Sequence, residues 1–219
     1  FKSACEKSGG EFVPVILKNH DSIISYFNYE LPEIKILDFG DGDSAAERIM
    51  DVIHADPWLL FGGIIAVVQD NKQKIALEKQ RDPNILLVLR RPDFEANSDR
   101  ILRILNQNKQ FLFNRGMQQQ MNTNETGSFV SDNDPMDILF YCNLITSYLY
   151  NTNRINDEGR AGVQGALMEL LLNAVEHGNC KISYDEKTAW LSAGKNMLDL
   201  IAEKCKTPEA LNKKVYISY

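Results

Sequence analysis

Three polar side chains recur at intervals of four residues in one segment of the chain, at Glu169, Asn173 and His177. Residues four apart share one face of an α-helix, so a helix here would present a carboxylate, an amide and an imidazole in one row. The amide oxygen can bind a hard cation, the carboxylate can orient or deprotonate an attacking group, and the imidazole can contact phosphate oxygens. These residues, called the Glu169 row, suit a magnesium–nucleotide site; the alternative is a polar face on a core helix.

Three further polar residues, Asp38, Gln69 and Arg91, come just after apolar segments that have the composition of β-strands. In a parallel sheet the carboxyl ends of the strands lie at one edge, where open α/β folds bind their ligands. Together these residues, called the Asp38 group, would form an acceptor carboxylate with a cation nearby. The alternative for Asp38 is a turn residue that caps the following helix.

The elements that must position the Asp38 group alternate between strand and helix along the first half of the chain. We expect strands at 12–17, 34–37, 63–68 and 85–89, and helices at 21–29, from Ala45 to near Pro57, at 72–79 and at 95–113. Asp43 or Ser44 would cap the second helix. Fully apolar strands such as 63–68 are typical of a parallel sheet with helices on both faces, so the expected fold class is α/β.

The composition changes after this half. Residues 117–134 are mostly polar and predict a linker, with a possible short strand at 128–131. Beyond it we expect helices at 135–150, 157–177 and 185–206 and a strand at 215–219. The predicted organisation is therefore a first domain at 1–116, a linker at 117–134 and a second domain at 135–219.

Length and composition exclude several classes of protein. The chain has 219 residues, a formal charge of −6 and 44% hydrophobic residues, which argues against disorder and against a broad nucleic-acid-binding surface. Its longest apolar run, Trp58–Val68, is too short to span a bilayer, so we expect no membrane anchor. The four cysteines form no Cys-x-x-Cys pair and there are three histidines, so a zinc site is not expected. Reduced thiols in a cytoplasmic protein are the simplest interpretation.

The spacing from Asp38 to Arg91-Pro92 resembles the receiver domain of two-component response regulators, and the resemblance covers roughly residues 1–115. In that family the aspartate after the third strand is phosphorylated, a Ser or Thr closes the fourth strand and Lys-Pro closes the fifth. The resemblance implies a flavodoxin-like, doubly wound parallel sheet, with Asp38 as the phosphoacceptor and with Gln69 and Arg91 at the phosphate site.

Two residues depart from the receiver pattern. Gln69 stands where the family has its hydroxyl, and Arg91 replaces the lysine with a fork-shaped charge. The acidic pair that holds Mg²⁺ in the family follows a first strand, and no strand precedes residues 1–7. We therefore expect either that the real protein begins earlier or that the receiver is incomplete.

The segment Glu169–Asn179 resembles the N-box of the GHKL ATPase superfamily. It is closest to the anti-sigma-factor serine kinase branch, whose N-box is similar to Glu-x-x-x-Asn-Ala-x-Glu-His-Gly; residues 128–150 resemble that branch's first strand and helix. The resemblance implies an α+β domain that binds ATP and Mg²⁺. It assigns Glu169 as the catalytic base, Asn173 as the Mg²⁺ ligand and His177 as a phosphate contact.

The rest of the family's nucleotide site does not follow His177. The family has a later Asp-x-Gly-x-Gly loop that holds the adenine, and a glycine-rich lid, and neither is found there. The pattern does occur at residues 38–42, but this is on the wrong side of the Glu169 row, and we interpret it as a loop between strand and helix. We expect a partial ATPase domain, and weak or no ATP binding by this polypeptide.

Two hypotheses of function follow. In the first, a receiver-like domain controls an ATP-dependent serine/threonine kinase domain of the anti-sigma type, as in a bacterial signalling protein. In the second, a degenerate receiver and a degenerate ATPase domain act only by binding proteins. The expected partners are an upstream kinase and a downstream regulator, and the analogy with receivers suggests a homodimer through residues 85–113.

Overall fold

The computed structural model describes residues 2–7, 11–40, 45–109 and 127–218. It divides into two compact units: unit 1 comprises residues 1–125 and 147–154, and unit 2 comprises 126–146 and 155–219. Residues 147–154, which the sequence placed in the second domain, are thus grouped with unit 1. Residues 117–126 of the predicted linker lie outside the described residues. Its remaining part contains a strand of unit 2, at 128–131.

Unit 1 is built on a parallel sheet of three strands in the order β1-β2-β3. The strands are β1 (Ile34–Asp38), β2 (Gly63–Val68) and β3 (Ile85–Arg90), which confirms three of the four predicted strands. Asp38 pairs with Val67, and Val68 pairs with Arg90, so the three strands end at one edge. The α/β class predicted for this half is therefore confirmed.

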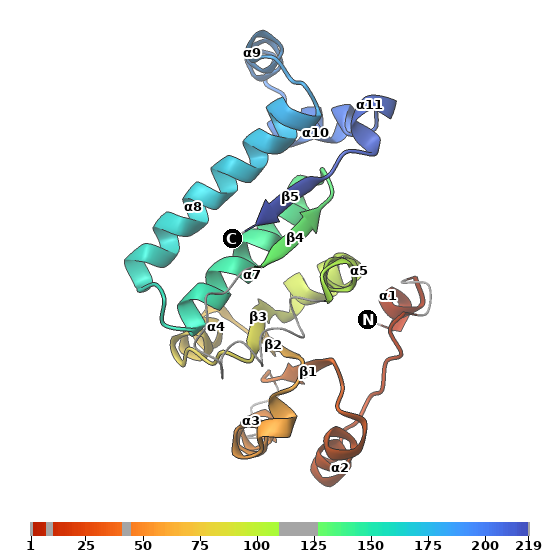
Figure 1. Ribbon diagram of the computed structural model, residues 1–219, viewed down its shortest axis with the longest axis vertical. Coiled ribbons are helices and arrows are strands. Elements are labelled where there is room, and N and C mark those ends of the chain that lie inside the picture. Colours follow the sequence, from red (N-terminus) through yellow and green to blue (C-terminus); the bar gives the residue numbers. More distant parts are fainter. Residues whose placement is uncertain (1, 8–10, 41–44, 110–126, 219) are drawn as a thin grey trace. The chain divides into compact units, whose positions relative to one another are not determined.

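The predicted strand at 12–17 is wrong. This segment connects two helices as irregular chain and joins no sheet among the described residues (Figure 1). Pro14 has no backbone N–H to donate to a ladder. Val13 and Ile16 are exposed, so the apolar composition that suggested a strand does not reflect burial on a sheet.

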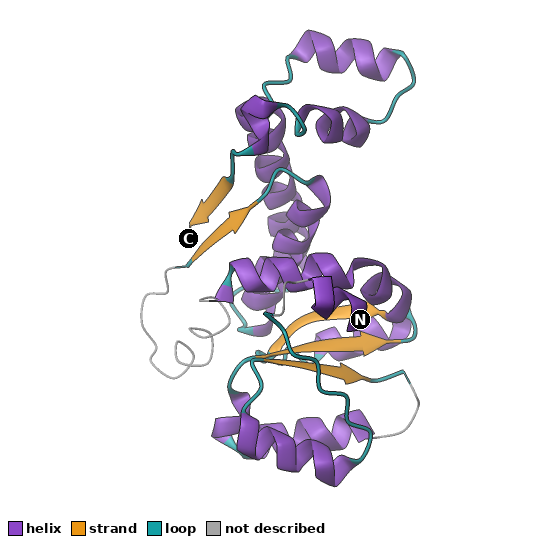
Figure 2. Ribbon diagram, turned by 90° about the vertical axis from the view of Figure 1, so that its right-hand side faces the viewer, coloured by secondary structure: helices purple, strands orange, loops and turns teal. Residues whose placement is uncertain are grey.

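The helices of unit 1 precede, connect or follow its strands, and helices cover both faces of the sheet (Figures 1 and 2). They are α1 (Lys2–Lys7), α2 (His20–Glu30), α3 (Ala45–Ala55), the 3-10 turn η1 (Pro57–Leu60), α4 (Asn71–Lys79) and α5 (Arg91–Gln107). The side chain of Asn19 caps α2, and that of Asp70 caps α4. The predicted caps of α3, Asp43 and Ser44, and the predicted helix end at 110–113 lie outside the described residues.

Both faces of β2 are buried, which is why its six residues are all apolar or glycine. Its Ile64, Ala66 and Val68 belong to a core shared with α2, α3 and α4. Its other face meets α5, which begins directly after β3. Gly62 precedes β2 with a φ of +78°, and a Cβ there would lie 2.2 Å from the Glu33 carbonyl oxygen, so this position requires glycine.

Unit 2 combines a two-stranded antiparallel sheet with helices. Its strands are β4 (Ser128–Ser131) and β5 (Val215–Ser218), and its helices are α7 (Pro135–Asn151), α8 (Asp157–Asn173), the π-helical turn η2 (Ala174–Asn179), α9 (Tyr184–Ser192), α10 (Met197–Lys204) and α11 (Pro208–Leu211). The core contains Ile138, Leu171, Val175, Ile201 and Val215. The last turn of α7 falls within unit 1, where Asn151 Nδ2 donates to the carbonyls of Asp82 and Ile85.

Two helix predictions for unit 2 need correction. The single helix expected at 185–206 is two helices, because the chain turns at Gly194 with a φ of +72°. The helix expected to run regularly to His177 changes type after Asn173. Across the described residues, no helix is both long and apolar enough to cross a bilayer.

Candidate functional site

The structure brings the three members of the Asp38 group together at the carboxyl edge of the parallel sheet. Asp38 is the last residue of β1, Gln69 follows β2, and Arg91 follows β3 as the first residue of α5. Arg91 Nη2 donates a hydrogen bond of 2.6 Å to Asp38 Oδ2, although 53 residues separate them. The predicted neighbourhood of carboxylate and cation is therefore present as a direct ion pair.

Gly40 closes this group from the side of the β1–α3 loop. Its N–H donates to Asp38 Oδ1 at 2.9 Å, so a backbone donor and a guanidinium hold the two carboxylate oxygens. A Cβ at Gly40 would lie 3.0 Å from Arg91 Nη2, 3.0 Å from Asp38 Oδ1 and 3.1 Å from Gln69 Cγ. Gln69 thus borders the same small space, and glycine leaves room for the ion pair. The sequence places Gly40 in a loop and indicates no further role for it.

Solvent reaches the Asp38–Arg91 pair, since the two side chains are 39% and 36% exposed. A second ion pair lies on the same edge, between Arg90 Nε and Asp93 Oδ2 at 2.8 Å. The hydrogen bond from Arg90 to Asp93 raises the pKa of Arg90. The described part of the chain holds no group of three or more His, Cys, Asp or Glu residues that could bind a metal ion.

A buried lysine lies on the same strand as Asp38. Lys35 is 3% exposed, and its Nζ donates to the Phe61 carbonyl at 2.5 Å. Burial lowers the pKa of Lys35 to about 8, because a low-dielectric surrounding disfavours the charged ammonium. The sequence pattern places Lys35 in an apolar strand and indicates no role for it.

One hydrogen bond joins two members of the Glu169 row. Asn173 Nδ2 donates to Glu169 Oε1 at 3.0 Å, which confirms that these two positions face each other on α8. Glu169 is exposed and Asn173 is half-buried. The hydrogen bond engages the amide nitrogen with Glu169, so Asn173 Oδ1 is the atom that could bind a cation.

His177 belongs to the π-helical turn η2 and not to α8. The η2 turn ends where the N–H of Cys180 donates to the carbonyl of Val175, five residues earlier. His177 Nδ1 donates to the Ile182 carbonyl at 2.8 Å, because a carbonyl can only accept. This bond assigns the proton to Nδ1 and leaves Nε2, 3.9 Å from Glu176 Oε2, for a ligand.

Two polar contacts beside the Glu169 row are not indicated by the sequence. Glu176 is 5% exposed and accepts a hydrogen bond of 2.6 Å from Lys187 Nζ, which supplies the charge that a buried carboxylate needs. Asn179 Nδ2 donates to Asn133 Oδ1 at 2.7 Å and so joins the end of η2 to the loop after β4. Both contacts join residues distant in sequence, and no local spacing signals them.

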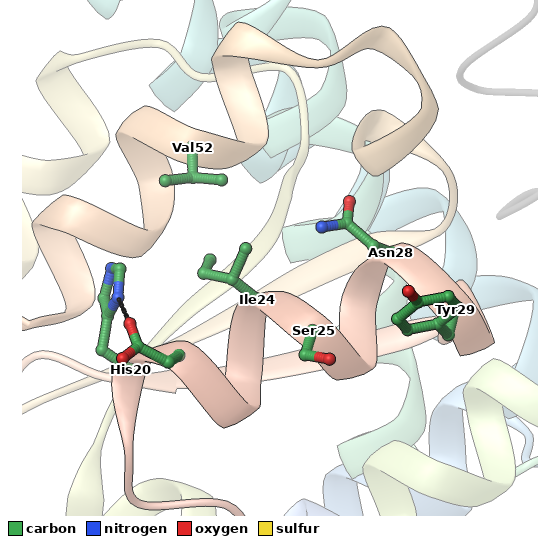
Figure 3. A pocket seen from close by; sticks show the side chains of 7 residues that line it. His20, Ile24, Ser25, Asn28, Tyr29 and Val52 are labelled. Atoms are coloured by element: carbon green, nitrogen blue, oxygen red, sulfur yellow. Dashed lines mark hydrogen bonds and ion pairs between the residues drawn. The ribbon is translucent and has the colours of Figure 1, made fainter.

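Two of the cavities in the described part of unit 1 border α2 or β1, away from the Asp38 group. One, of about 430 Å³, is a groove between α2 and α3 lined by His20, Asp21, Ser25, Tyr29 and Val52 among others (Figure 3). The other, of about 330 Å³, lies between residues 12–17 and β1. None of the six predicted site residues lines either cavity.

No family model, no curated protein and no solved structure matches this chain. The geometry of the Asp38 group and of the Glu169 row, together with the resemblance of their motifs, therefore carries the functional argument.

Proposed function

We propose that this chain is part of a signal-transduction regulator in which a receiver-like unit 1 controls an ATP-binding unit 2 of the anti-sigma-factor serine/threonine kinase type. The observation that supports it most is the convergence of the Asp38 group at the carboxyl edge of a parallel sheet. The residues come from the ends of three strands, which is where an open α/β sheet acts on its ligands.

In unit 1, Asp38 is the proposed phosphoacceptor. One of its carboxylate oxygens attacks the phosphorus of a phosphodonor, and the bond from phosphorus to the donor's leaving group breaks. Arg91 then exchanges the carboxylate for the phosphoryl oxygens, which it can bind in a bidentate manner. The ion pair between Asp38 and Arg91 is thus the unphosphorylated state.

In unit 2, the Glu169 row is the proposed half of a magnesium–nucleotide site. Asn173 Oδ1 would bind the cation, His177 Nε2 would contact phosphate, and Glu169 would orient the attacking hydroxyl as the base. The hydrogen bond between Asn173 and Glu169, and that from His177 Nδ1, support these roles because they fix which atom of each side chain is available.

Calorimetric titration with Mg·ATP tests the kinase part of the proposal. We expect binding by the intact parent protein of which this chain is a part, and its loss in Asn173→Ala. Asn212→Ala, a change at an exposed asparagine of unit 2 outside the row, should bind as the wild type does. Absence of binding by the wild type would overturn the ATP-binding role. It would leave the second hypothesis, a module that acts through protein binding, which the glutamine at position 69 favours.

Treatment with acetyl phosphate tests unit 1 separately. Mass spectrometry should detect one phosphoryl group, which Asp38→Asn abolishes and Asp51→Asn, a change at an exposed aspartate of α3, does not. Phosphorylation that survives Asp38→Asn would exclude Asp38 as the acceptor. Light scattering of the same samples tests the proposed homodimer through residues 85–113, since a monomer at high concentration contradicts it.

A further inference from the structure

Two cysteine side chains of unit 2 lie in direct contact. The Sγ atoms of Cys180 and Cys205 are 3.1 Å apart, and both residues are free thiols. The sulfur atoms of a disulfide are separated by about 2.05 Å. A movement of about 1 Å would therefore bring this pair to bonding distance.

Ordered backbone holds each of the two thiols in place. Cys180 follows η2, and its N–H donates to the Val175 carbonyl at 2.8 Å. Cys205 follows α10, and its N–H donates to the Ile201 carbonyl at 2.8 Å. The sulfurs thus meet because two helix ends position them, and little conformational entropy remains to be lost when a bond forms between them.

The two thiols differ in their access to solvent. Cys180 is 8% exposed, whereas Cys205 is half-buried, so a small reagent in solution reaches Cys205 first. Burial, with the contact to Cys180, raises the pKa of the Cys205 thiol to about 12. Since the thiolate is the nucleophile, the raised pKa slows the reaction of Cys205 with an oxidant.

We propose that Cys180 and Cys205 form an oxidative modification site, a dithiol that hydrogen peroxide converts to an intramolecular disulfide. In the first step the Cys205 sulfur attacks one peroxide oxygen, the O–O bond breaks, and a sulfenic acid and one water are formed. In the second step the Cys180 sulfur attacks the sulfenic sulfur, the S–O bond breaks and a second water leaves. A small dithiol reduces the disulfide to two thiols by thiol–disulfide exchange and is itself oxidised to a disulfide.

Oxidation at this site would act on the end of the segment that carries His177. The thiol of Cys205 donates to the Asn133 carbonyl at 3.2 Å, and the side chain of Asn133 accepts from Asn179 in η2. The disulfide removes this S–H donor and ties the residue after η2 to the end of α10. The proposal concerns unit 2 alone and does not depend on ATP binding.

Peptide mapping of the full chain tests the site directly. After treatment with hydrogen peroxide and blocking of free thiols with N-ethylmaleimide, a non-reducing digest should contain the Cys180 and Cys205 peptides joined. Their joint mass is lower by two hydrogen atoms, and dithiothreitol separates them. We expect this pair to exceed any other cysteine pair by more than about tenfold, because only adjacent thiols have a high effective concentration.

Two variants and one further measurement complete the test. Cys205→Ser should abolish the joined peptides, and Cys142→Ser, a change at a fully buried thiol, should leave their yield unchanged. Three results for the wild type would each overturn the proposal, whether or not the variants fold. They are sulfinic acid at Cys205 with a free thiol at Cys180, a joined pair that includes Cys5 or Cys142, and no oxidation at all. Hydrogen exchange in residues 174–179 should slow on oxidation; unchanged exchange would overturn the effect on η2.

Discussion

The Asp38 group and the Glu169 row each contain three polar side chains, but tertiary structure brings the first three together and secondary structure the second three. The Asp38 group comes from the ends of three strands and is joined by an ion pair of 2.6 Å between residues 53 apart in sequence. The Glu169 row comes from one helix and its π-helical end, and its internal contact is a hydrogen bond of 3.0 Å between residues four apart. The first arrangement needs a packed sheet, whereas the second needs only one helix and the π-helical turn at its end.

This difference predicts that shortening one apolar side chain of β2 and one of α8 has unequal effects on stability. Ile64→Ala removes a fully buried side chain of β2 and should lower the free energy of unfolding of unit 1 by about 2–5 kcal/mol. Leu170→Ala, at a position 66% exposed on α8, should change stability by less than about 0.5 kcal/mol. Hydrogen exchange in β2 and in α8 measures the two regions separately. Similar effects of the two changes would contradict the comparison.

The pH dependence of stability should come from the region of the Asp38 group, because Lys35 lies on the same strand as Asp38. Folding lowers the pKa of Lys35 to about 8, whereas in the unfolded chain it is roughly 10.4. Between these values the unfolded state binds more protons, so the free energy of unfolding should rise with pH, by about 3 kcal/mol at most. Lys35→Met should remove this rise, while Lys72→Met, at an exposed lysine, should keep it. Urea unfolding of the three proteins between pH 7.5 and 11 measures the difference; identical curves would refute it.

A pair of glycine substitutions compares the space at the two sites. Gly40→Ala places a methyl group 3.0 Å from both Arg91 Nη2 and Asp38 Oδ1, and should destabilise unit 1 by about 1 kcal/mol. Gly165→Ala on α8 meets nothing within 4 Å and should stabilise that helix by about 0.5–1 kcal/mol, because alanine is the better helix former. Thermal unfolding should therefore shift in opposite directions, and shifts of the same sign would disprove the contrast.

The smallest expected effect concerns the ion pair itself. Because both partners are more than a third exposed, Arg91→Ala should cost about 0.5 kcal/mol of stability, and this loss should disappear in 1 M salt. Asn173→Ala on the row should show no such salt dependence, since its hydrogen bond joins an amide to an exposed carboxylate. Urea unfolding at low and high salt measures both. A loss that persists at high salt would show that Arg91 acts through packing.

Local composition was sufficient to predict the strands that carry the Asp38 group. The runs at 63–68 and 85–89 are apolar on both faces, and only a covered parallel sheet accommodates such strands. The order of these strands then placed Asp38, Gln69 and Arg91 at one edge. What the sequence did not predict is the ion pair or the role of Gly40, since both depend on distances set by the packed sheet.

The misses share a physical cause. Residues 12–17 have the composition of a strand but not its pairing, and composition does not reveal whether a neighbouring strand is available. The ion pair between Glu176 and Lys187 joins η2 to α9, so no helical spacing signals it. In the same way, Asn151 ends a helix that begins in unit 2 and bonds to the carbonyls of unit 1. Contacts between segments distant in sequence could thus not be predicted from the sequence.

The π-helical turn at the end of α8 affects the angular alignment of the row. In an α-helix a step of four residues exceeds one turn by roughly 40°, so three groups at this spacing drift around the axis in a slow spiral. A π turn contains more residues, so the same step from Asn173 to His177 covers less rotation. The change of helix type therefore reduces the angle by which the step to His177 departs from the line of Glu169 and Asn173. In a helix of one type, the three side chains would be spread over a wider angle around the axis.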